Sequence, residues 1–445
     1  MTMSGTYFDS VTTPIPFGGQ DTTDPLSFSW YDKDRVVGDK TMAEHLRFAV
    51  CYWHSFAWDG SDIFGDGTRN LPWHDPSLDP MKAAELKQDA AFDFFVKLGV
   101  PYYCFHDVDM APAGATFAEE TANLNKMVDR AARLQDETGV KLLWGTANLF
   151  SHPRFAAGAA TNPDPAVFAR AAAQVCNALE ATHRLGGQNY VLWGGREGYE
   201  TLLNTDMKRE MENLARFFHL VIEHKKKIGF EGTILIEPKP FEPTKHQYDF
   251  DSATVHAFLQ AFDLVDEVKL NIEVNHATLA GHDFHHEIAY AVDNGILGSI
   301  DANAGDERLG WDVDRFPVSV EQMTLGMHEL LRGGGFTTGG LNFDSKLRRQ
   351  SMSSDDLFHA HIGGMDVMSK SFLVANAMIE DNALEGYKAE RYAGWNGDLG
   401  QKIHDGSLAL DSLREQATTS PDPRPISGQQ EMLENLVARY IDRAK

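Results

Sequence analysis

Short acidic segments follow several predicted β-strands, and together they contribute six carboxylates and one histidine. Acidic side chains rarely follow apolar runs unless something cationic meets them. Oxygen-rich sites of this kind suit hard divalent cations such as magnesium or manganese. The sequence therefore predicts a metal centre. Its candidate ligands are Glu237, Glu273, His276, Asp301, Asp312, Asp314 and Asp344.

The charge of these side chains favours two cations over one. Six carboxylates in one pocket cannot all ionise unaided, because like charges raise one another's pKa. Two divalent cations would offset four of the six negative charges. Lys239, two residues after Glu237 and on the same side of the strand, would offset one more. Glu273 and His276 are spaced so that one carboxylate could bridge two ions while the imidazole binds one of them. A single cation remains an alternative, but it leaves the site very acidic.

His106 and Asp109 follow another predicted strand and form a candidate acid–base pair. A carboxylate near a histidine fixes its tautomer and supports its charged form, which suits proton transfer at a hydroxyl. Aromatic residues gather in the same segments, and their ring faces could stack on a sugar and exclude water. Each of them could equally be part of a barrel core. These aromatic residues are Trp53, Trp58, Phe64, Trp144 and Trp193.

Eight short runs rich in apolar, β-branched or aromatic residues alternate with helical stretches, several of which end at glycine. Eight strand-then-helix units predict an α/β fold, a (β/α)8 TIM barrel, in which chemistry sits at the C-terminal ends of the strands. A doubly wound open sheet is the alternative. The predicted strands are Phe48–Trp53, Tyr102–His106, Lys141–Trp144, Tyr190–Trp193, Thr233–Ile236, Val268–Ile272, Gly298–Ile300 and Gly340–Phe343.

The flanking segments differ from the barrel in composition. Residues 1–45 are rich in Gly, Pro, Thr and Asp and are predicted to be an N-terminal extension that runs over the surface. Residues 46–383 are predicted to be the catalytic barrel domain. Residues 384–445 are helical but interrupted by a proline-rich break, which predicts a C-terminal arm that contacts a neighbouring subunit.

Composition excludes several classes of function. A net charge of −25 makes nucleic acid or an anionic membrane a poor partner. The chain has no run of 18 apolar residues and no signal-peptide pattern at its start, so a cytoplasmic protein without a membrane span is expected. Cys51, Cys104 and Cys176 are predicted to be buried free thiols.

Three common motifs fail on inspection. The segment that begins at Asp301 lacks the glycine and the final glutamate of an EF-hand loop. His285-His286-Glu287 does not have the HExxH spacing, since Tyr290 stands where the second histidine is required. Gly194–Gly198 lacks the spacing of a dinucleotide fingerprint, so no nicotinamide site is predicted.

Five short motifs, taken together, indicate the kind of protein much more specifically than any one of them does alone. They are Phe105–Asp109, Tyr190–Gly198, Leu235–Pro240, Glu273–Thr278 and Asn342–Asp344. In these motifs, and along nearly its whole length, the chain resembles the xylose isomerase family, and within it the longer subclass with an N-terminal extension. The resemblance implies a metal-dependent aldose–ketose isomerase that converts D-xylose to D-xylulose, and D-glucose to D-fructose less efficiently. Ring opening would precede a metal-assisted 1,2-hydride shift.

The resemblance also implies roles for particular residues. One cation, Mg²⁺ with Mn²⁺ or Co²⁺ possible, would be held by Glu237, Glu273, Asp301 and Asp344, and a second by Glu273, His276, Asp312 and Asp314. His106, oriented by Asp109, would assist ring opening, and Lys239 would hold the sugar O1. The substrate would be bordered by Trp53, Trp193, Trp144 and Val191, with Phe64 contributed by a neighbouring subunit of a homotetramer.

Two rival functions remain open from the residues alone. A different divalent-metal barrel enzyme, acting on another sugar or on phosphodiesters, would need more histidine ligands and a basic rim for phosphates. A sugar-binding protein without activity would have little use for Lys239 or for the His106–Asp109 pair. Product formation from xylose, with and without a chelator, separates these possibilities.

Overall fold

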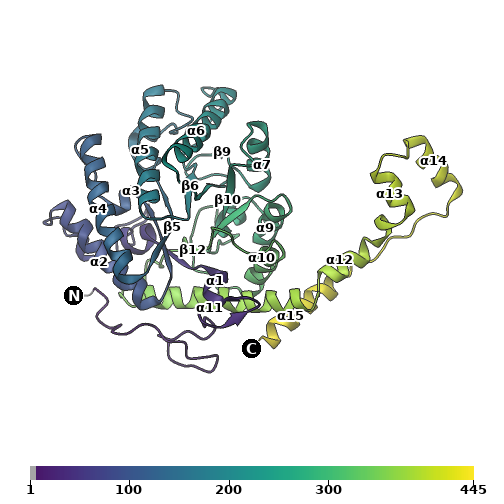
Figure 1. Cartoon of the computed structure of the whole chain (residues 1–445), viewed down its shortest axis with the longest axis horizontal. Helices are drawn as coiled ribbons and strands as arrows, with labels where there is room; N and C mark the ends of the chain where they lie inside the picture. The colour runs from purple at the N-terminus through teal and green to yellow at the C-terminus, as the bar shows by residue number, and fades with distance from the viewer. Residues whose placement is uncertain (1–6, 445) are drawn as a thin grey trace.

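A closed barrel of eight parallel strands forms the centre of the computed structural model, which describes residues 7–444 (Figure 1). Barrel strands that follow one another along the chain also lie side by side, in the cyclic order β3-β4-β5-β6-β8-β10-β11-β12. The predicted (β/α)8 barrel is therefore confirmed, and the open-sheet alternative is wrong. The strands are β3 (Ala49–Cys51), β4 (Tyr102–His106), β5 (Lys141–Thr146), β6 (Asn189–Trp193), β8 (Thr233–Glu237), β10 (Val268–Glu273), β11 (Leu297–Asp301) and β12 (Leu341–Phe343).

Each barrel strand is followed by a long helix, and these helices form the outer layer (Figure 1). Several of them end where glycine adopts the left-handed conformation, as at Gly99 (φ 79°) and Gly139 (φ 77°). Among residues 7–444, no helix is long and apolar enough to cross a membrane. The outer helices are α2 (Pro80–Leu98), α4 (Phe117–Thr138), α5 (Pro165–Arg184), α6 (Met207–Ile228), α7 (Ser252–Ala261), α9 (Phe284–Asp293), α10 (Val320–Arg332) and α11 (Asp356–Glu380).

The barrel strands are buried on both faces, as expected for a parallel sheet covered by helices. A small apolar cluster inside the barrel includes Cys104, Trp144 and Val191, so two of the predicted substrate neighbours also belong to the core. Cys51 and Cys104 are buried free thiols, as predicted. The prediction for Cys176 is wrong, because this residue lies on the outer layer and is only partly buried.

The segment before the barrel is anchored by side chains rather than lying loosely on the surface. Phe8, Phe28 and Tyr31 are buried in the main core. The Asp366 carboxylate on α11 accepts hydrogen bonds of 2.8–2.9 Å from three successive backbone N–H groups, those of Ser29, Trp30 and Tyr31. The aromatic residues of this N-terminal segment are spaced without periodicity, so the sequence pattern does not predict their burial. Residues 1–6 of the predicted extension lie outside the described residues.

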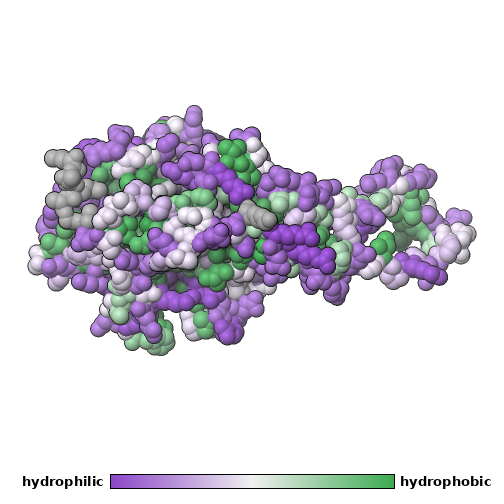
Figure 2. Space-filling view, turned by 90° about the horizontal axis from the view of Figure 1, so that it is seen from below, coloured by the Kyte–Doolittle hydropathy of each residue, from purple (hydrophilic) through white to green (hydrophobic). Residues whose placement is uncertain are grey.

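The C-terminal segment projects away from the barrel (Figure 1). Helix α15 packs back on α11, where Val437 joins Val374 and Met378 in a small cluster and the Tyr440 hydroxyl donates to Asp381 at 2.7 Å. Between α12 (Glu385–Arg391) and α15 the chain forms a remote tip on which both apolar and polar side chains reach the surface (Figure 2). The helices of this segment are α12 (Glu385–Arg391), α13 (Asp398–His404), α14 (Leu410–Thr419) and α15 (Gln430–Arg443).

Helix α11 also carries a buried histidine that makes stability depend on pH. His361 is fully buried among Phe94, Phe316 and Phe343, and its Nδ1 lies 2.8 Å from the Leu357 carbonyl oxygen. Burial lowers the pKa of His361 from 6.5 to about 4. Below pH 6.5 His361 binds a proton in the unfolded chain but stays neutral in the folded chain. The free energy of unfolding therefore falls as the pH decreases from 6.5 toward 4.

Replacing His361 by leucine is therefore expected to flatten the acid side of the stability profile. Between pH 7 and about pH 4.5, the free energy of unfolding should fall by about 2 kcal/mol less in the variant than in the wild type. Urea unfolding at both pH values measures this difference, and the carboxylates common to both proteins cancel in the comparison. Parallel profiles for the two proteins would contradict it.

Candidate active site

Four carboxylates meet at the C-terminal rim of the barrel. Glu237, Glu273 and Asp301 are the last residues of β8, β10 and β11, and Asp344 directly follows β12. Since neighbouring parallel strands run in register, Glu273 lies opposite Asp301 across the sheet. Oxygen atoms from all four side chains lie within 4.8 Å of one another. Side chains up to 107 residues apart in the chain are thus close enough to bind one cation together.

A second group of ligands lies beside the first and shares Glu273 with it. Oxygen atoms of Glu273, Asp312 and Asp314 also lie within 4.8 Å of one another. The Nε2 atom of His276 is 3.0 Å from Glu273 and 3.1 Å from Asp312. The structure therefore brings together all seven residues predicted as metal ligands, and Glu273 is the side chain that joins the two groups.

Burial and mutual repulsion perturb these carboxyl groups strongly. Burial, followed by the charges of Asp301 and Glu273, raises the pKa of Glu237 well above its usual value. Burial and the nearby Asp312 likewise raise the pKa of Glu273 well above its usual value. Burial and Asp344 raise the pKa of Asp301 to about 7. Burial and repulsion thus oppose ionisation of these carboxyl groups, and divalent cations would stabilise the ionised form, so the donor set fits such cations.

Basic side chains of the chain itself balance part of this charge. Lys239 is 4% exposed, and its Nζ lies 2.7 Å from Asp312 and 3.3 Å from Glu242. Burial opposes ionisation of Asp312, but the charges of Lys239 and His276 hold the pKa of this carboxyl group well below its usual value. The Lys239 Nζ also lies 5.3 Å from the ring of Trp193, where a cation is attracted by the π-system.

Two basic residues of the site, His54 and Lys346, were not predicted from the sequence. His54 Nε2 lies 3.0 Å from Asp344 and 3.2 Å from Asp314. Burial opposes protonation, but hydrogen bonds to these two carboxylates raise the pKa of His54 to about 9. Lys346 Nζ lies 3.0 Å from Asp314. The signals were present, since His54 directly follows Trp53 beyond the first strand and Lys346 lies two residues after Asp344.

Buried amides hold the carboxylates in place. Asn271 Nδ2 donates at 2.8 Å to both Glu237 and Asp301, and Asn342 Nδ2 donates to Asp301 at 2.8 Å. Asn303 Nδ2 donates to Glu273 at 2.7 Å. Asn271 and Asn342 each precede an acidic residue by two positions, so strand alternation could have identified them as neighbours of the site. These contacts orient the oxygen atoms toward one another and limit their motion.

The predicted acid–base pair is assembled as well. The Nδ1 atom of His106 lies 2.9 Å from the Asp109 carboxylate, so Nδ1 carries the shared proton and Nε2 remains the free ring nitrogen. The Trp53 ring packs edge-on against His106, with ring centroids 4.5 Å apart. Phe150, which was not predicted, packs against both His106 and Trp193. The imidazole is thus fixed in orientation by a carboxylate and by aromatic walls.

A cavity of about 200 Å³ connects the acid–base pair with the carboxylates. Four residues predicted to border the substrate, Trp53, Trp144, Val191 and Trp193, line it together with Lys239. Its lining also includes His54, Thr146 and Phe150, none of which was predicted. Phe64 does not reach this cavity, because its side chain is 88% exposed in a loop after β3. A second hollow of about 240 Å³ lies elsewhere on this end of the barrel and holds none of the clustered carboxylates.

Glu197 shapes the loop beside this cavity. Its carboxylate, only 7% exposed, accepts hydrogen bonds from the backbone N–H groups of Ala159 (3.2 Å), Ala160 (2.8 Å) and Thr161 (2.9 Å). The acidic side chain of the glycine-rich segment around Glu197 therefore binds a neighbouring loop.

Replacing Glu197 by alanine is expected to lower the free energy of unfolding by about 3 kcal/mol or more, because it leaves three buried N–H groups unpaired at about 1 kcal/mol or more each. Glutamine at this position keeps one acceptor oxygen and should cause a smaller loss. Denaturant unfolding of both variants tests this, and equal losses would show that the hydrogen bonds are not the cause.

Comparison with known proteins places the chain in a family. Residues 92–321 match the model of the xylose isomerase-like TIM barrel, and residues 388–441 match the XylA2 C-terminal domain. The chain is 59% identical to the xylose isomerase of Mannheimia succiniciproducens, over 98% of this chain and 99% of that protein. It is 58% identical to the xylose isomerase of Salmonella newport, with the same coverage.

Among solved structures, an L-ribulose 3-epimerase is similar in fold, with a TM-score of 0.51 and 15% identity over 76% of this chain and 98% of that one. Identity this low supports the barrel architecture alone. The identity to the two bacterial relatives is high and extends over nearly the full length, including the projecting C-terminal segment. The chain therefore belongs to the xylose isomerase family.

Proposed function

We propose that this protein interconverts D-xylose and D-xylulose, and D-glucose and D-fructose less efficiently, with two divalent cations in each subunit. Family membership supports the reaction class. The observation that carries the proposal is the joint placement of two carboxylate groups, a histidine–aspartate pair and a buried lysine around one small cavity. The cavity has a volume of about 200 Å³ and is walled by aromatic rings, which suits a small sugar.

The chain offers enough ligands for both cations. Glu237, Glu273, Asp301 and Asp344 would hold the first, and Glu273, His276, Asp312 and Asp314 would hold the second. Carboxylate oxygens dominate both sets, which favours Mg²⁺, with Mn²⁺ and Co²⁺ as alternatives. When bound, such cations supply Lewis-acid polarisation of neighbouring sugar oxygens and stabilise negative charge on them.

The remaining steps fall to side chains. His106 in its charged form, with the Nδ1 proton held by Asp109, presents Nε2–H to the ring oxygen of the sugar and gives it that proton as the bond from C1 to the ring oxygen breaks, while the O1 hydroxyl loses its proton to solvent. The Lys239 ammonium, fixed by Asp312, donates to O1 and offsets negative charge there. Trp53 and Trp193 exclude water while hydrogen moves from C2 to C1. Trp144 and Val191 border the far end of the sugar and favour a pentose.

We further infer a homotetramer in which the neighbouring subunit supplies Phe64. The loop that carries Phe64 exposes two large apolar side chains, Ile63 at 92% and Phe64 at 88%. The tip between α12 and α15 also lacks a core of its own. Its exposed apolar residues include Tyr392, Trp395, Leu399, Ile403 and Leu410. Apolar surface of this extent is typical of protein interfaces.

Excision of the tip is expected to lower the mass of the oligomer. Tyr387 Oη donates to the Gly428 carbonyl at 3.1 Å, and Arg391 donates to the Ser427 carbonyl at 3.2 Å, so the two ends of the tip lie together. A short glycine linker can therefore replace residues 392–426 without removing α15 from α11. Analytical ultracentrifugation should show a smaller assembly for this variant. An unchanged mass, with folding verified by circular dichroism, would reject the interface.

The catalytic proposal is tested by incubating the protein with xylose, with and without a chelator. Xylulose should form only while divalent cations are available, and readdition of Mg²⁺ should restore the activity. A generic phosphodiester serves as the control substrate for the rival metal-dependent enzyme. No xylulose with Mg²⁺, Mn²⁺ or Co²⁺ would overturn the proposal.

A further inference from the structure

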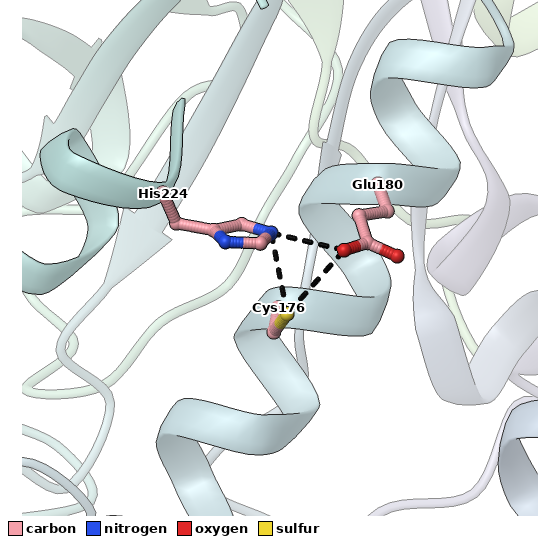
Figure 3. Close-up of side chains that lie close together, drawn as sticks. All are labelled: Cys176, Glu180 and His224. Atoms are coloured by element: carbon pink, nitrogen blue, oxygen red, sulfur yellow. Dashed lines mark hydrogen bonds and ion pairs between the residues drawn. The ribbon is translucent and has the colours of Figure 1, made fainter. Parts of the chain in front are cut away.

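Three side chains that can bind a metal converge on the outer layer of the barrel, in a group separate from the strand-end carboxylates. Cys176 and Glu180 are one turn apart on α5, and His224 faces them from α6 (Figure 3). The His224 Nε2 lies 3.2 Å from Cys176 Sγ and 3.1 Å from Glu180 Oε1, and these last two atoms are 3.6 Å apart. The residues thus present a sulfur, a nitrogen and an oxygen donor to one point.

The spacing of these three atoms matches that of ligands around a tetrahedral ion. With bond lengths of about 2.3 Å to sulfur, about 2.05 Å to nitrogen and about 2.0 Å to oxygen, tetrahedral angles separate the donors by about 3.3–3.6 Å. The observed separations of 3.1–3.6 Å lie within a few tenths of an ångström of these values. Small side-chain adjustments would therefore admit an ion without moving either helix.

We propose that Cys176, Glu180 and His224 bind a borderline-soft divalent transition-metal ion such as Zn²⁺, with water as the fourth ligand. The fourth position faces solvent, since the His224 side chain is 19% exposed and that of Glu180 is 49% exposed. Thiolate and imidazole ligands favour Zn²⁺ or Co²⁺ over Mg²⁺, which distinguishes this site from the oxygen-rich centre in the barrel.

The surroundings of Cys176 support a bound cation. Leu179, Leu220 and Val221 form an apolar pocket beside the sulfur. Burial and the adjacent Glu180 raise the pKa of the Cys176 thiol. Lys227 of α6 offsets this effect only in part, since the pKa is still raised. A divalent ion would replace the thiol proton and compensate both negative ligands directly. Binding would join α5 to α6 and stabilise that part of the outer layer.

Cobalt spectroscopy gives a signal that only a thiolate ligand produces. Titration of the full-length protein with Co²⁺ should generate a near-ultraviolet charge-transfer band from sulfur to metal. Cys176→Ser should abolish this band, and His224→Gln should shift its midpoint to higher Co²⁺ concentration. His183→Gln, an exposed histidine on the same helix α5, is the matched control and should behave like the wild type.

A second measurement uses the wild-type chain alone. Cys176 is the only cysteine that is not buried, so it should be the one alkylated under native conditions. With the barrel sites saturated by Mg²⁺, Zn²⁺ at ten times its Kd should slow this alkylation by about tenfold, because only the metal-free fraction reacts. Excess chelator should restore the rate.

The outcomes are distinct. A charge-transfer band that disappears in Cys176→Ser, together with protection by Zn²⁺, supports the site. A wild-type protein without the band overturns it. A band that persists in Cys176→Ser also overturns it, because the sulfur ligand would then be Cys51 or Cys104. Alkylation that is indifferent to Zn²⁺ overturns it as well.

Discussion

Replacing Glu273 by glutamine is expected to lower kcat for xylose by about 10³-fold or more, because removal of a single group that stabilises developing charge already costs about 10²–10³-fold. Glu273 belongs to all of the ligand groups at the barrel rim, so its loss weakens both cation sites together. Glutamine keeps the size of the side chain and an oxygen that can accept from Asn303, and it replaces the other oxygen and the charge by an NH2 group. Steady-state kinetics and the metal content of the dialysed protein measure the effect.

Two comparisons make this prediction specific. Asp312→Asn removes a ligand of one group only, so the variant should still bind one cation with nearly wild-type affinity. Glu267→Gln removes a carboxylate that is paired with Lys226 on the outer surface, and it should leave both kcat and metal content unchanged. If Glu273→Gln loses no more activity or metal than Asp312→Asn, Glu273 does not join the two groups.

His106→Asn is expected to lower kcat/KM for xylose by about 10²–10⁴-fold, the usual contribution of a positioned acid or base. The proposed role assigns the loss to ring opening, which needs the proton at Nε2, and not to the movement of hydrogen from C2 to C1. Xylose deuterated at C2 separates the two steps. In the variant, the deuterium isotope effect on kcat/KM should be no larger than in the wild type, because ring opening becomes slower than hydrogen transfer.

Asp109→Asn provides the matched comparison. The amide still contacts His106 Nδ1 but no longer supports its charged form, so this variant should show a smaller loss with the same isotope signature. Circular dichroism confirms that both variants fold. An isotope effect that increases in His106→Asn would place the damage at hydrogen transfer, and the role in ring opening would then be wrong.

The barrel and the positions of the carboxylates were accessible from sequence because strand geometry dictates them. An acidic residue that ends a buried parallel strand must lie at the rim, as Glu237, Glu273 and Asp301 do. The same rule, applied to the position two residues before each acidic residue, predicts that Asn271 and Asn342 also face the site. Strand periodicity therefore predicts these amide neighbours as well as the carboxylates.

Other features depend more on tertiary contacts than on any local pattern. His54 lies in the short helix Trp53–Ala57 and Lys346 in the loop after β12, and the closure of the barrel brings both to Asp314. Phe8 is buried against Phe94 and Phe358, and the backbone that follows Phe28 is held by Asp366 of α11, more than 300 residues away. Cys176 was predicted to be buried because its neighbours are apolar, but it lies on the flank of its helix, toward α6.

The most direct measurement is anomalous diffraction from crystals of this protein soaked with Mn²⁺ after treatment with a chelator. Two Mn²⁺ ions per subunit are expected at the barrel rim, one within bonding distance of Glu237, Glu273, Asp301 and Asp344, and the other bound by His276, Asp312 and Asp314. An empty rim, or manganese bound only at surface carboxylates, would contradict the proposal that these strand-end residues form the catalytic metal centre.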